Sequence, residues 1–143
     1  MTRFIVDASV AIPWAIPEVW SRQAELLLAP SHERIAPDWI VVEYRNAIWK
    51  HVRRGEVTGK EAREISSILS RYLTHVASLP LVGPALDIAV AIDQTVYDSV
   101  YVALAERTGL PFVTGDRPLY DAVKRTLTTS IIWIEDLPAA LDQ

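Results

Sequence analysis

Four carboxylate side chains interrupt stretches of sequence that are otherwise apolar, and they are the residues best placed to do chemistry. They are Asp7, Glu43, Asp98 and Asp116. A carboxylate held in apolar surroundings needs a partner, and several carboxylates together can bind a metal ion. The sequence therefore contains a candidate metal site built from oxygen ligands.

The types of donor atom indicate the ion and the reaction. The chain has no cysteine, and His32, His51 and His75 have no ligand spacing, so oxygen donors favour Mg²⁺ or Mn²⁺ over zinc. Two such ions, about 4 Å apart, can activate a water and stabilise the leaving oxygen in phosphodiester hydrolysis. No protein nucleophile is needed, and Ser9, the hydroxyl nearest Asp7 in sequence, has no histidine base beside it.

Hydrophobic periodicity predicts the elements that must position these acids. Apolar runs at residues 3–6 and 111–114 predict buried strands that end at Asp7 and just before Asp116. Further strands are predicted at residues 34–36, 76–79 and 130–134, and helices at 18–29, 38–54, 58–74, 84–92, 98–108 and 117–126. The helix at Thr58 has capping-box spacing, with Glu61 three residues later.

Short apolar strands separated by helices require crossover connections. This pattern predicts a three-layer α/β/α fold, with a mainly parallel central sheet covered by helices on both faces. Ligands bind beyond the carboxyl ends of such strands, where Asp7 and Asp116 are expected. The chain has 143 residues, half of them apolar, and no linker-like tract, so we expect a single domain over residues 1–143.

Each acid also has a purely structural explanation. Asp7, Asp98 and Asp116 each precede a predicted helix, and aspartate is a preferred N-cap residue. Glu43 could be a buried carboxylate paired with an arginine or a lysine. Capping is compatible with metal binding but does not explain Glu43, so the four acids taken together favour a metal site.

Four segments of the sequence resemble, in order, the signature segments of PIN-domain nucleases. They are Asp7-Ala8-Ser9-Val10, Glu43-Tyr44-Arg45-Asn46-Ala47, Tyr97-Asp98-Ser99-Val100-Tyr101-Val102-Ala103-Leu104-Ala105 and Thr114-Gly115-Asp116. The resemblance spans essentially the whole chain and is closest to the VapC-type toxins of bacterial and archaeal toxin–antitoxin pairs. Gly115 departs from the pattern, because the family often has Ala or Asn at that place.

The resemblance implies a PIN-like α/β/α fold and endoribonuclease activity that depends on Mg²⁺ or Mn²⁺. It also implies a homodimer that is inhibited by a small cognate antitoxin protein. By the matching segments, Asp7, Glu43, Asp98 and Asp116 would be the catalytic metal ligands, with Ser9 and Thr114 as hydroxyls that support them. The alternative is a catalytically inactive PIN-like module that binds RNA or protein, although such a module has no need of four carboxylates.

Basic residues near the acids are candidates for RNA contact. The predicted helix that contains Glu43 becomes basic toward its end, and Arg117 directly follows Asp116. We expect Arg45, Arg53, Arg54 and Arg117 to contact RNA phosphates, although a basic helix end is also favourable to the helix dipole. The net charge of −4 argues against a broad basic surface, so any RNA contact should be local.

The start of the sequence and the length of its apolar runs indicate the cellular compartment of the protein. No signal peptide precedes the first predicted strand, and no apolar run approaches the roughly 20 residues that a membrane-spanning helix needs. We therefore expect a cytoplasmic protein that does not contact a membrane.

Overall fold

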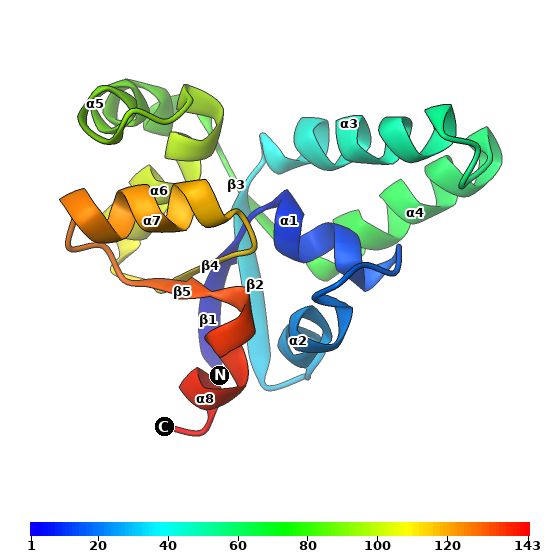
Figure 1. Ribbon diagram of the computed structural model, residues 1–143, viewed down its shortest axis with the longest axis horizontal. Helices are drawn as coiled ribbons and strands as arrows, with labels where there is room; N and C mark the ends of the chain where they lie inside the picture. Colours follow the sequence, from blue (N-terminus) through cyan, green and yellow to red (C-terminus); the bar gives the residue numbers. More distant parts are fainter.

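Short strands alternate with helices throughout the chain, and the computed structural model describes all of residues 1–143 (Figure 1). The strands are β1 (Thr2–Val6), β2 (His32–Pro37), β3 (Thr74–Val76), β4 (Phe112–Thr114) and β5 (Ile131–Trp133). The helices are α1 (Ala8–Ala11), α2 (Ser21–Glu25), α3 (Ile40–Arg53), α4 (Gly59–Tyr72), α5 (Val82–Ile92), α6 (Val96–Thr108), α7 (Arg117–Thr126) and α8 (Leu137–Leu141).

The five strands form one parallel sheet in the order β3-β2-β1-β4-β5. From β1 the chain adds β2 and β3 on one side, and then returns to add β4 and β5 on the other. The direction of winding therefore reverses between β1 and β4, where Val6 pairs with Val113. In open parallel sheets, such a reversal leaves a crevice beyond the carboxyl ends of the two strands, and ligands bind there.

Helices cover both sides of this sheet, as predicted. In Figure 1, α5, α6 and α7 lie to the left of β2, whereas α1, α2, α3 and α4 lie to its right. Helix α6 packs directly on β1, β2 and β4, and α5 packs on the outside of α6. The residues of α6 from Ser99 to Ala105 are all buried, which explains why this helix is apolar on nearly every face. One cluster of 36 buried residues joins the sheet and the helices.

The predicted helices and strands are present, with two local differences. Residues 18–29 contain only α2 and a 3-10 turn at Leu26–Leu28, which ends at Ala29 because Pro30 restricts that residue to extended backbone. The strand predicted at 76–79 is present as the shorter β3, which begins two residues earlier and ends at Val76, and a 3-10 turn follows at Leu79–Leu81. The capping box of α4 is confirmed: the Glu61 N–H donates to Thr58 Oγ1, and the Thr58 N–H donates to Glu61 Oε1, both at 3.0 Å.

No single helix is long and apolar enough to cross a membrane; the segments Leu79–Ile92 and Val96–Thr108 meet that criterion only when joined across a bend of 109°.

Candidate active site

Asp7 lies where β1 ends and α1 begins, at the reversal point of the sheet. Its Oδ1 accepts the Ser9 N–H at 3.1 Å, so Asp7 is the N-cap of α1. Oδ1 also accepts the Ser9 hydroxyl, and Oδ2 accepts the Thr114 hydroxyl at 2.6 Å. The side chain is 7 % exposed, and hydrogen bonds to both oxygens fix its orientation.

The two hydroxyls connect Asp7 to the loop after β4. Ser9 Oγ accepts the Gly115 N–H at 2.7 Å, and Thr114 Oγ1 accepts the Asp116 N–H at 3.0 Å. A Cβ atom at position 115 would lie 3.3 Å from Ser9 Oγ, which is a tight contact. Glycine therefore allows the loop to approach Ser9 closely enough for the backbone hydrogen bond to form.

Asp116 and Asp98 occupy different positions at their helix N-termini. Asp116 is the N-cap of α7, and its Oδ1 accepts the Leu119 N–H at 3.2 Å. The prediction that Asp98 precedes its helix is wrong, because Thr95 is the N-cap and α6 begins at Val96. Asp98 lies in the first turn, and its Oδ2 accepts the Thr95 hydroxyl at 3.1 Å. A negative charge in the first turn of a helix is stabilised by the helix dipole.

Glu43 lies in the first turn of α3 and is held by a tyrosine from α6. Its Oε1 accepts the Tyr101 hydroxyl at 2.5 Å. The Tyr101 ring is 1 % exposed and stacks on Phe112, with ring centroids 5.9 Å apart. The alternative pairing of Glu43 with an arginine or a lysine is not observed, since no ion pair involves it. Sequence reasoning missed Tyr101, although it lies three residues after Asp98 and hence on a neighbouring position of the same helix face.

Burial and the repulsion between neighbouring acids raise the pKa of three of these carboxyl groups, those of Asp7, Glu43 and Asp98. Burial raises the pKa of Asp7 to about 6, partly opposed by the Ser9 and Thr114 hydrogen bonds and reinforced by the charges of Asp116 and Asp98. Burial likewise raises the pKa of Glu43 to about 7; the Tyr101 hydrogen bond opposes this rise, and the other three acids add to it. Burial raises the pKa of Asp98 as well. The four acids therefore share one region and repel one another.

The acids gather at one edge of the sheet without forming a closed cage. No three acidic or histidine side chains converge closely enough to coordinate a common ion. Mg²⁺ often takes only one or two protein carboxylates and fills its remaining positions with water and substrate phosphate, so a closed cage is not required. The donors are all oxygen atoms, and their mutual repulsion favours a bound cation. By these criteria the four acids fit Mg²⁺ or Mn²⁺.

Two of the four predicted RNA-binding arginines lie together near the end of α3. Arg53 and Arg54 join Lys50 in lining a hollow of about 420 Å³ that has no other lining residue. Lys50 also lines a second groove, which Glu43 borders. Residues 43, 46, 50 and 53 are spaced three or four apart, so they form one stripe along α3. Basic side chains therefore continue the stripe on which Glu43 lies.

The other two arginines lie elsewhere. Arg45 donates to the Val41 carbonyl at 3.0 Å and to the Tyr44 hydroxyl at 3.1 Å, and it lines a different hollow, between α3 and α4. Arg117 pairs with Asp121 at 3.1 Å. Its guanidinium also lies 5.1 Å from the ring centres of Tyr120 and Trp133. The structure thus does not bring Arg45 or Arg117 together with Arg53 and Arg54.

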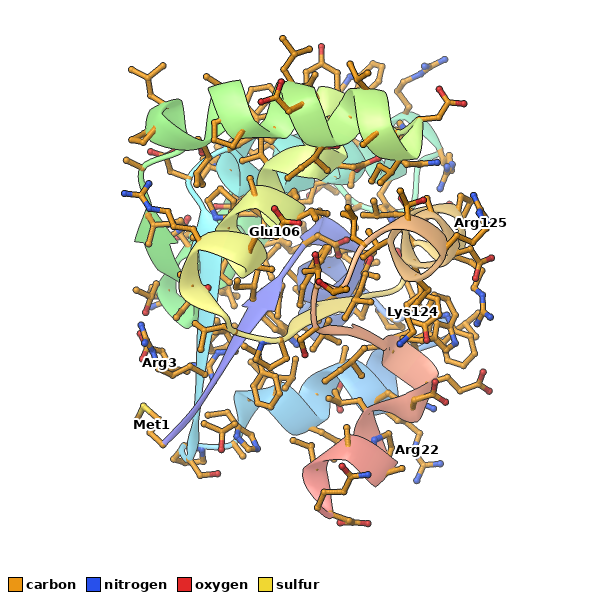
Figure 2. All side chains as sticks on the ribbon, turned by 90° about the vertical axis from the view of Figure 1, so that its left-hand side faces the viewer. Met1, Arg3, Arg22, Glu106, Lys124 and Arg125 are labelled. Carbon is orange, nitrogen blue, oxygen red and sulfur yellow. The ribbon has the colours of Figure 1, made fainter.

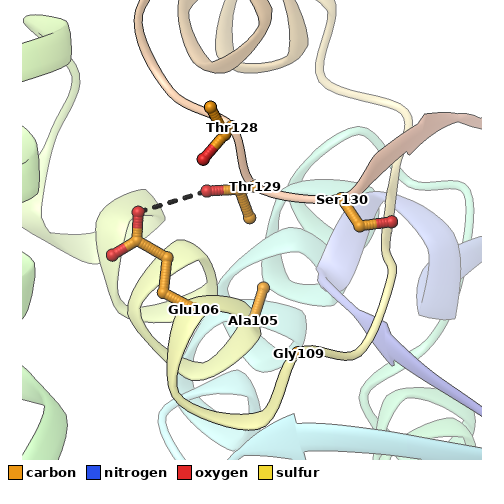
Figure 3. A pocket seen from close by; sticks show the side chains of 6 residues that line it. All are labelled: Ala105, Glu106, Gly109, Thr128, Thr129 and Ser130. Atoms are coloured by element: carbon orange, nitrogen blue, oxygen red, sulfur yellow. Dashed lines mark hydrogen bonds between the residues drawn. The ribbon is translucent and has the colours of Figure 1, made fainter.

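A polar hollow of about 350 Å³ lies at the other end of the sheet (Figure 3). It is bordered by Gly109 and Ser130, which precede β4 and β5, and the Thr129 hydroxyl donates to Glu106 Oε1 at 3.2 Å. Glu106 is the only carboxylate that lines this hollow, so the hollow has no second cluster of acids that could bind a metal ion.

Two curated relatives match nearly the whole chain. Ribonuclease VapC3 of Pyrobaculum aerophilum is 32 % identical over 129 residues, which cover 88 % of this chain and 98 % of the relative. Exonuclease VapC9 of the same organism is 33 % identical over 133 residues, which cover 92 % of this chain and 93 % of the relative. No family model matches the sequence.

Solved structures share the fold. PAE2754 from Pyrobaculum aerophilum has a TM-score of 0.71 at 24 % identity, covering 99 % of this chain and 96 % of that one. VapBC2 from Rickettsia felis, bound to a DNA fragment from its promoter, has a TM-score of 0.65 at 11 % identity, with coverage of 92 % and 98 %. VapC20 from Mycobacterium tuberculosis, described as a sarcin-ricin loop cleaving toxin, also has a TM-score of 0.65, at 17 % identity and with coverage of 83 % and 94 %.

The raised pKa values predict how the stability of the metal-free protein depends on pH. In the folded protein the pKa is about 6 for Asp7 and about 7 for Glu43, whereas the ordinary values are 3.8 and 4.5. Both groups therefore bind protons more tightly in the folded state. Protonation of these two groups therefore stabilises the folded state in full when the pH is below their ordinary pKa values. This stabilisation is lost as the pH rises through 6 and 7. In EDTA, the melting temperature should rise when the pH is lowered from 8 to 6.

A double variant, Asp7→Asn with Glu43→Gln, is the control for this measurement. It lacks both titrating groups, so its melting temperature should change less than that of the wild type over the same pH interval. If the melting temperatures of the two proteins changed by the same amount over this pH interval, these two side chains would not be the proton-binding groups.

Proposed function

Because the chain belongs to the VapC family of PIN-domain ribonucleases, we propose that it is a metal-dependent endoribonuclease and the toxin of a toxin–antitoxin pair. The observation that carries the proposal is the gathering of Asp7, Glu43, Asp98 and Asp116 where the winding of the sheet reverses. These carboxylates come from four separate elements, and a module that only binds a partner has no use for their mutual repulsion.

The four acids would hold the metal, and the groups around them would keep them in place. Bound Mg²⁺ or Mn²⁺ would lower the pKa of the attacking water and neutralise charge on the phosphate. Ser9 and Thr114 orient both oxygens of Asp7, and Tyr101 orients Glu43. The Thr95 hydroxyl orients Asp98, and the Leu119 N–H orients Asp116.

The stripe along α3 supports a path for the RNA backbone. Lys50 connects the groove beside Glu43 to the basic hollow of Arg53 and Arg54. These three cations would bind phosphates on one side of the cleaved bond, while the metal site binds the reacting phosphate. Arg45 is not part of this path, because it lines a different hollow. Arg117 pairs with Asp121, and only its nearness to Asp116 in sequence supports a phosphate contact.

A small antitoxin protein is the partner that this site would require in a living cell. An open cluster of carboxylates would be blocked by an arginine, because its planar guanidinium donates to two carboxylate oxygens at once. The Rickettsia felis neighbour contains VapB together with VapC, which supports a partner of this kind.

A second copy of this chain is the other proposed partner, and α5 offers the surface for it. Val82, Leu86 and Val90 recur every four residues on one face of α5 and are 42 %, 56 % and 78 % exposed. Leu79 extends the patch and is 80 % exposed. Figure 2 shows α5 along one edge of the molecule, with side chains that project away from the sheet. Several exposed apolar side chains on one helix face favour a protein interface, and we propose that two α5 helices meet across a twofold axis.

Metal dependence tests the activity itself. Single-stranded RNA should be cleaved in Mg²⁺ or Mn²⁺ and left intact in EDTA, and Ca²⁺ should support little cleavage because its coordination is larger and looser. RNA end-mapping should show internal cuts. Equal cleavage with and without EDTA would rule out the metal mechanism, and metal binding without cleavage of any RNA would favour the inactive module.

Asparagine variants separate metal binding from helix capping. Asp116→Asn keeps an oxygen that can cap α7, and Asp98→Asn leaves the Thr95 cap of α6 in place, but each removes a negative charge. Cleavage in Mn²⁺ should fall by roughly 100-fold or more, as is common when an electrostatic contact to the reacting group is lost. The melting temperature in EDTA should stay the same or rise, because repulsion is relieved. Cleavage near the wild-type rate by both variants would leave these residues as structural.

The proposed dimer is tested by a charge on the α5 face. Leu86→Glu places a carboxylate in the middle of the patch, so light scattering should change from a dimer to a monomer. Leu86→Met is the matched control and should remain dimeric, since it keeps an apolar side chain of similar volume. A wild-type protein that is already monomeric would contradict the proposed dimer.

A further inference from the structure

A groove of about 420 Å³ opens directly beside the candidate active site. Glu43 borders it, and α3 contributes Asn46 and Lys50 to its wall. Trp39 and Tyr97 form its aromatic part, and Tyr97 immediately precedes Asp98. Two of the proposed metal ligands are thus in or next to the groove, so a molecule held there would be close to a phosphate bound at the acids.

The aromatic part of the groove is a stack of two rings. The Trp39 and Tyr97 rings are nearly parallel, at 13°, and their centroids are 5.3 Å apart. Trp39 is partly buried against the hydrophobic core and its Nε1 has no hydrogen-bond partner, so apolar packing and stacking hold this ring. Tyr97 is 60 % exposed although Trp39 covers one side of it. A flat ring is therefore presented to solvent at the edge of the active site.

We propose that Tyr97 is the platform on which an unpaired RNA base stacks, next to the phosphate that is cleaved. The inference rests on the proposed ribonuclease function and adds a base-binding site to it. Proteins that bind single-stranded RNA hold splayed bases on aromatic side chains and bind the intervening phosphates with basic ones. Here a base on Tyr97 would extend the Trp39–Tyr97 stack by one ring.

The polar residues of the groove favour a nucleotide over a protein side chain. The Asn46 side chain has both a donor and an acceptor to offer to a base edge. Lys50 supplies a cation for the neighbouring phosphate, and it leads on to Arg53 and Arg54. The exposed face of α5 from Val82 to Val90, by contrast, carries no basic residue, as expected for contact with another protein.

A double-mutant cycle between Tyr97 and the base tests the proposal. The substrate is a single-stranded RNA that the wild type cleaves at one bond in Mn²⁺, and each nucleotide flanking that bond is replaced in turn by an abasic one. For the wild type, one such replacement should lower kcat/KM by about 10- to 100-fold, the range typical of a lost base stack. Tyr97→Leu should show a similar loss on intact RNA and little further loss on the abasic substrate. Tyr97→Phe keeps the ring and should remain within about threefold of the wild type.

Three controls identify what any loss means. Tyr72→Leu removes another exposed tyrosine, at the end of α4 and outside the groove, and should show no coupling to any abasic position. Mn²⁺ binding, measured by calorimetry, and the melting temperature should be unchanged in Tyr97→Leu. Light scattering should return the same mass as for the wild type.

Two results would overturn the platform while leaving the ribonuclease function intact. The first is equal abasic losses in the wild type and in Tyr97→Leu. The second is a Tyr97→Leu protein that cleaves normally but has lost its dimer mass or its antitoxin binding, which would make the groove a protein-binding surface. A wild type that cleaves no RNA in Mg²⁺ or Mn²⁺ would instead remove the proposed function on which the platform rests.

Discussion

The burial of several carboxylates at one edge of the sheet is the constraint around which this end of the molecule is built. Removing a carboxylate from water is costly, and placing a second one nearby adds repulsion. No arginine or lysine pairs with any of the four acids. Hydroxyl groups and helix N-termini stabilise them instead, and these groups leave carboxylate lone pairs free for a cation. A site completed by arginine or lysine would leave fewer carboxylate lone pairs free for a cation.

The topology of the sheet determines why residues so far apart in sequence can meet. Asp7 and Asp116 are brought together because β1 and β4 are neighbours at the point where the winding reverses. The Thr114–Asp7 hydrogen bond joins residues 107 positions apart across that point. Glu43 reaches the same edge from the first turn of α3, where Tyr101 of the buried helix α6 donates a hydrogen bond to it. The site therefore depends on the central helix as much as on the strands.

The sequence predicted the strand ends, the parallel sheet and the helices, because hydrophobic period and capping residues are local properties. It could not distinguish a cap from a first-turn residue at Asp98, since Thr95 and Asp98 both suit an N-terminus and only backbone geometry decides between them. The hydrogen bond from Tyr101 to Glu43 was also beyond reach, because it joins two helices 58 residues apart. For the same reason, the Trp39–Tyr97 stack could not be predicted without knowing how the N-termini of α3 and α6 are placed relative to each other.

The two ends of α3 carry charges of opposite sign, and the helix dipole stabilises both. Glu43 lies in its first turn and Lys50 and Arg53 lie in its last, so each charge is at the end of the helix that the dipole favours. Glu43 and Arg53 are ten residues apart along the helix, about 15 Å, which is more than a Debye length at physiological salt. The basic end can attract an RNA backbone without neutralising the acids, and the acids can bind a cation without repelling the backbone along its whole path. The charge order that stabilises the helix is thus also the order in which the proposed substrate would meet phosphate-binding groups, a base platform and then the metal site.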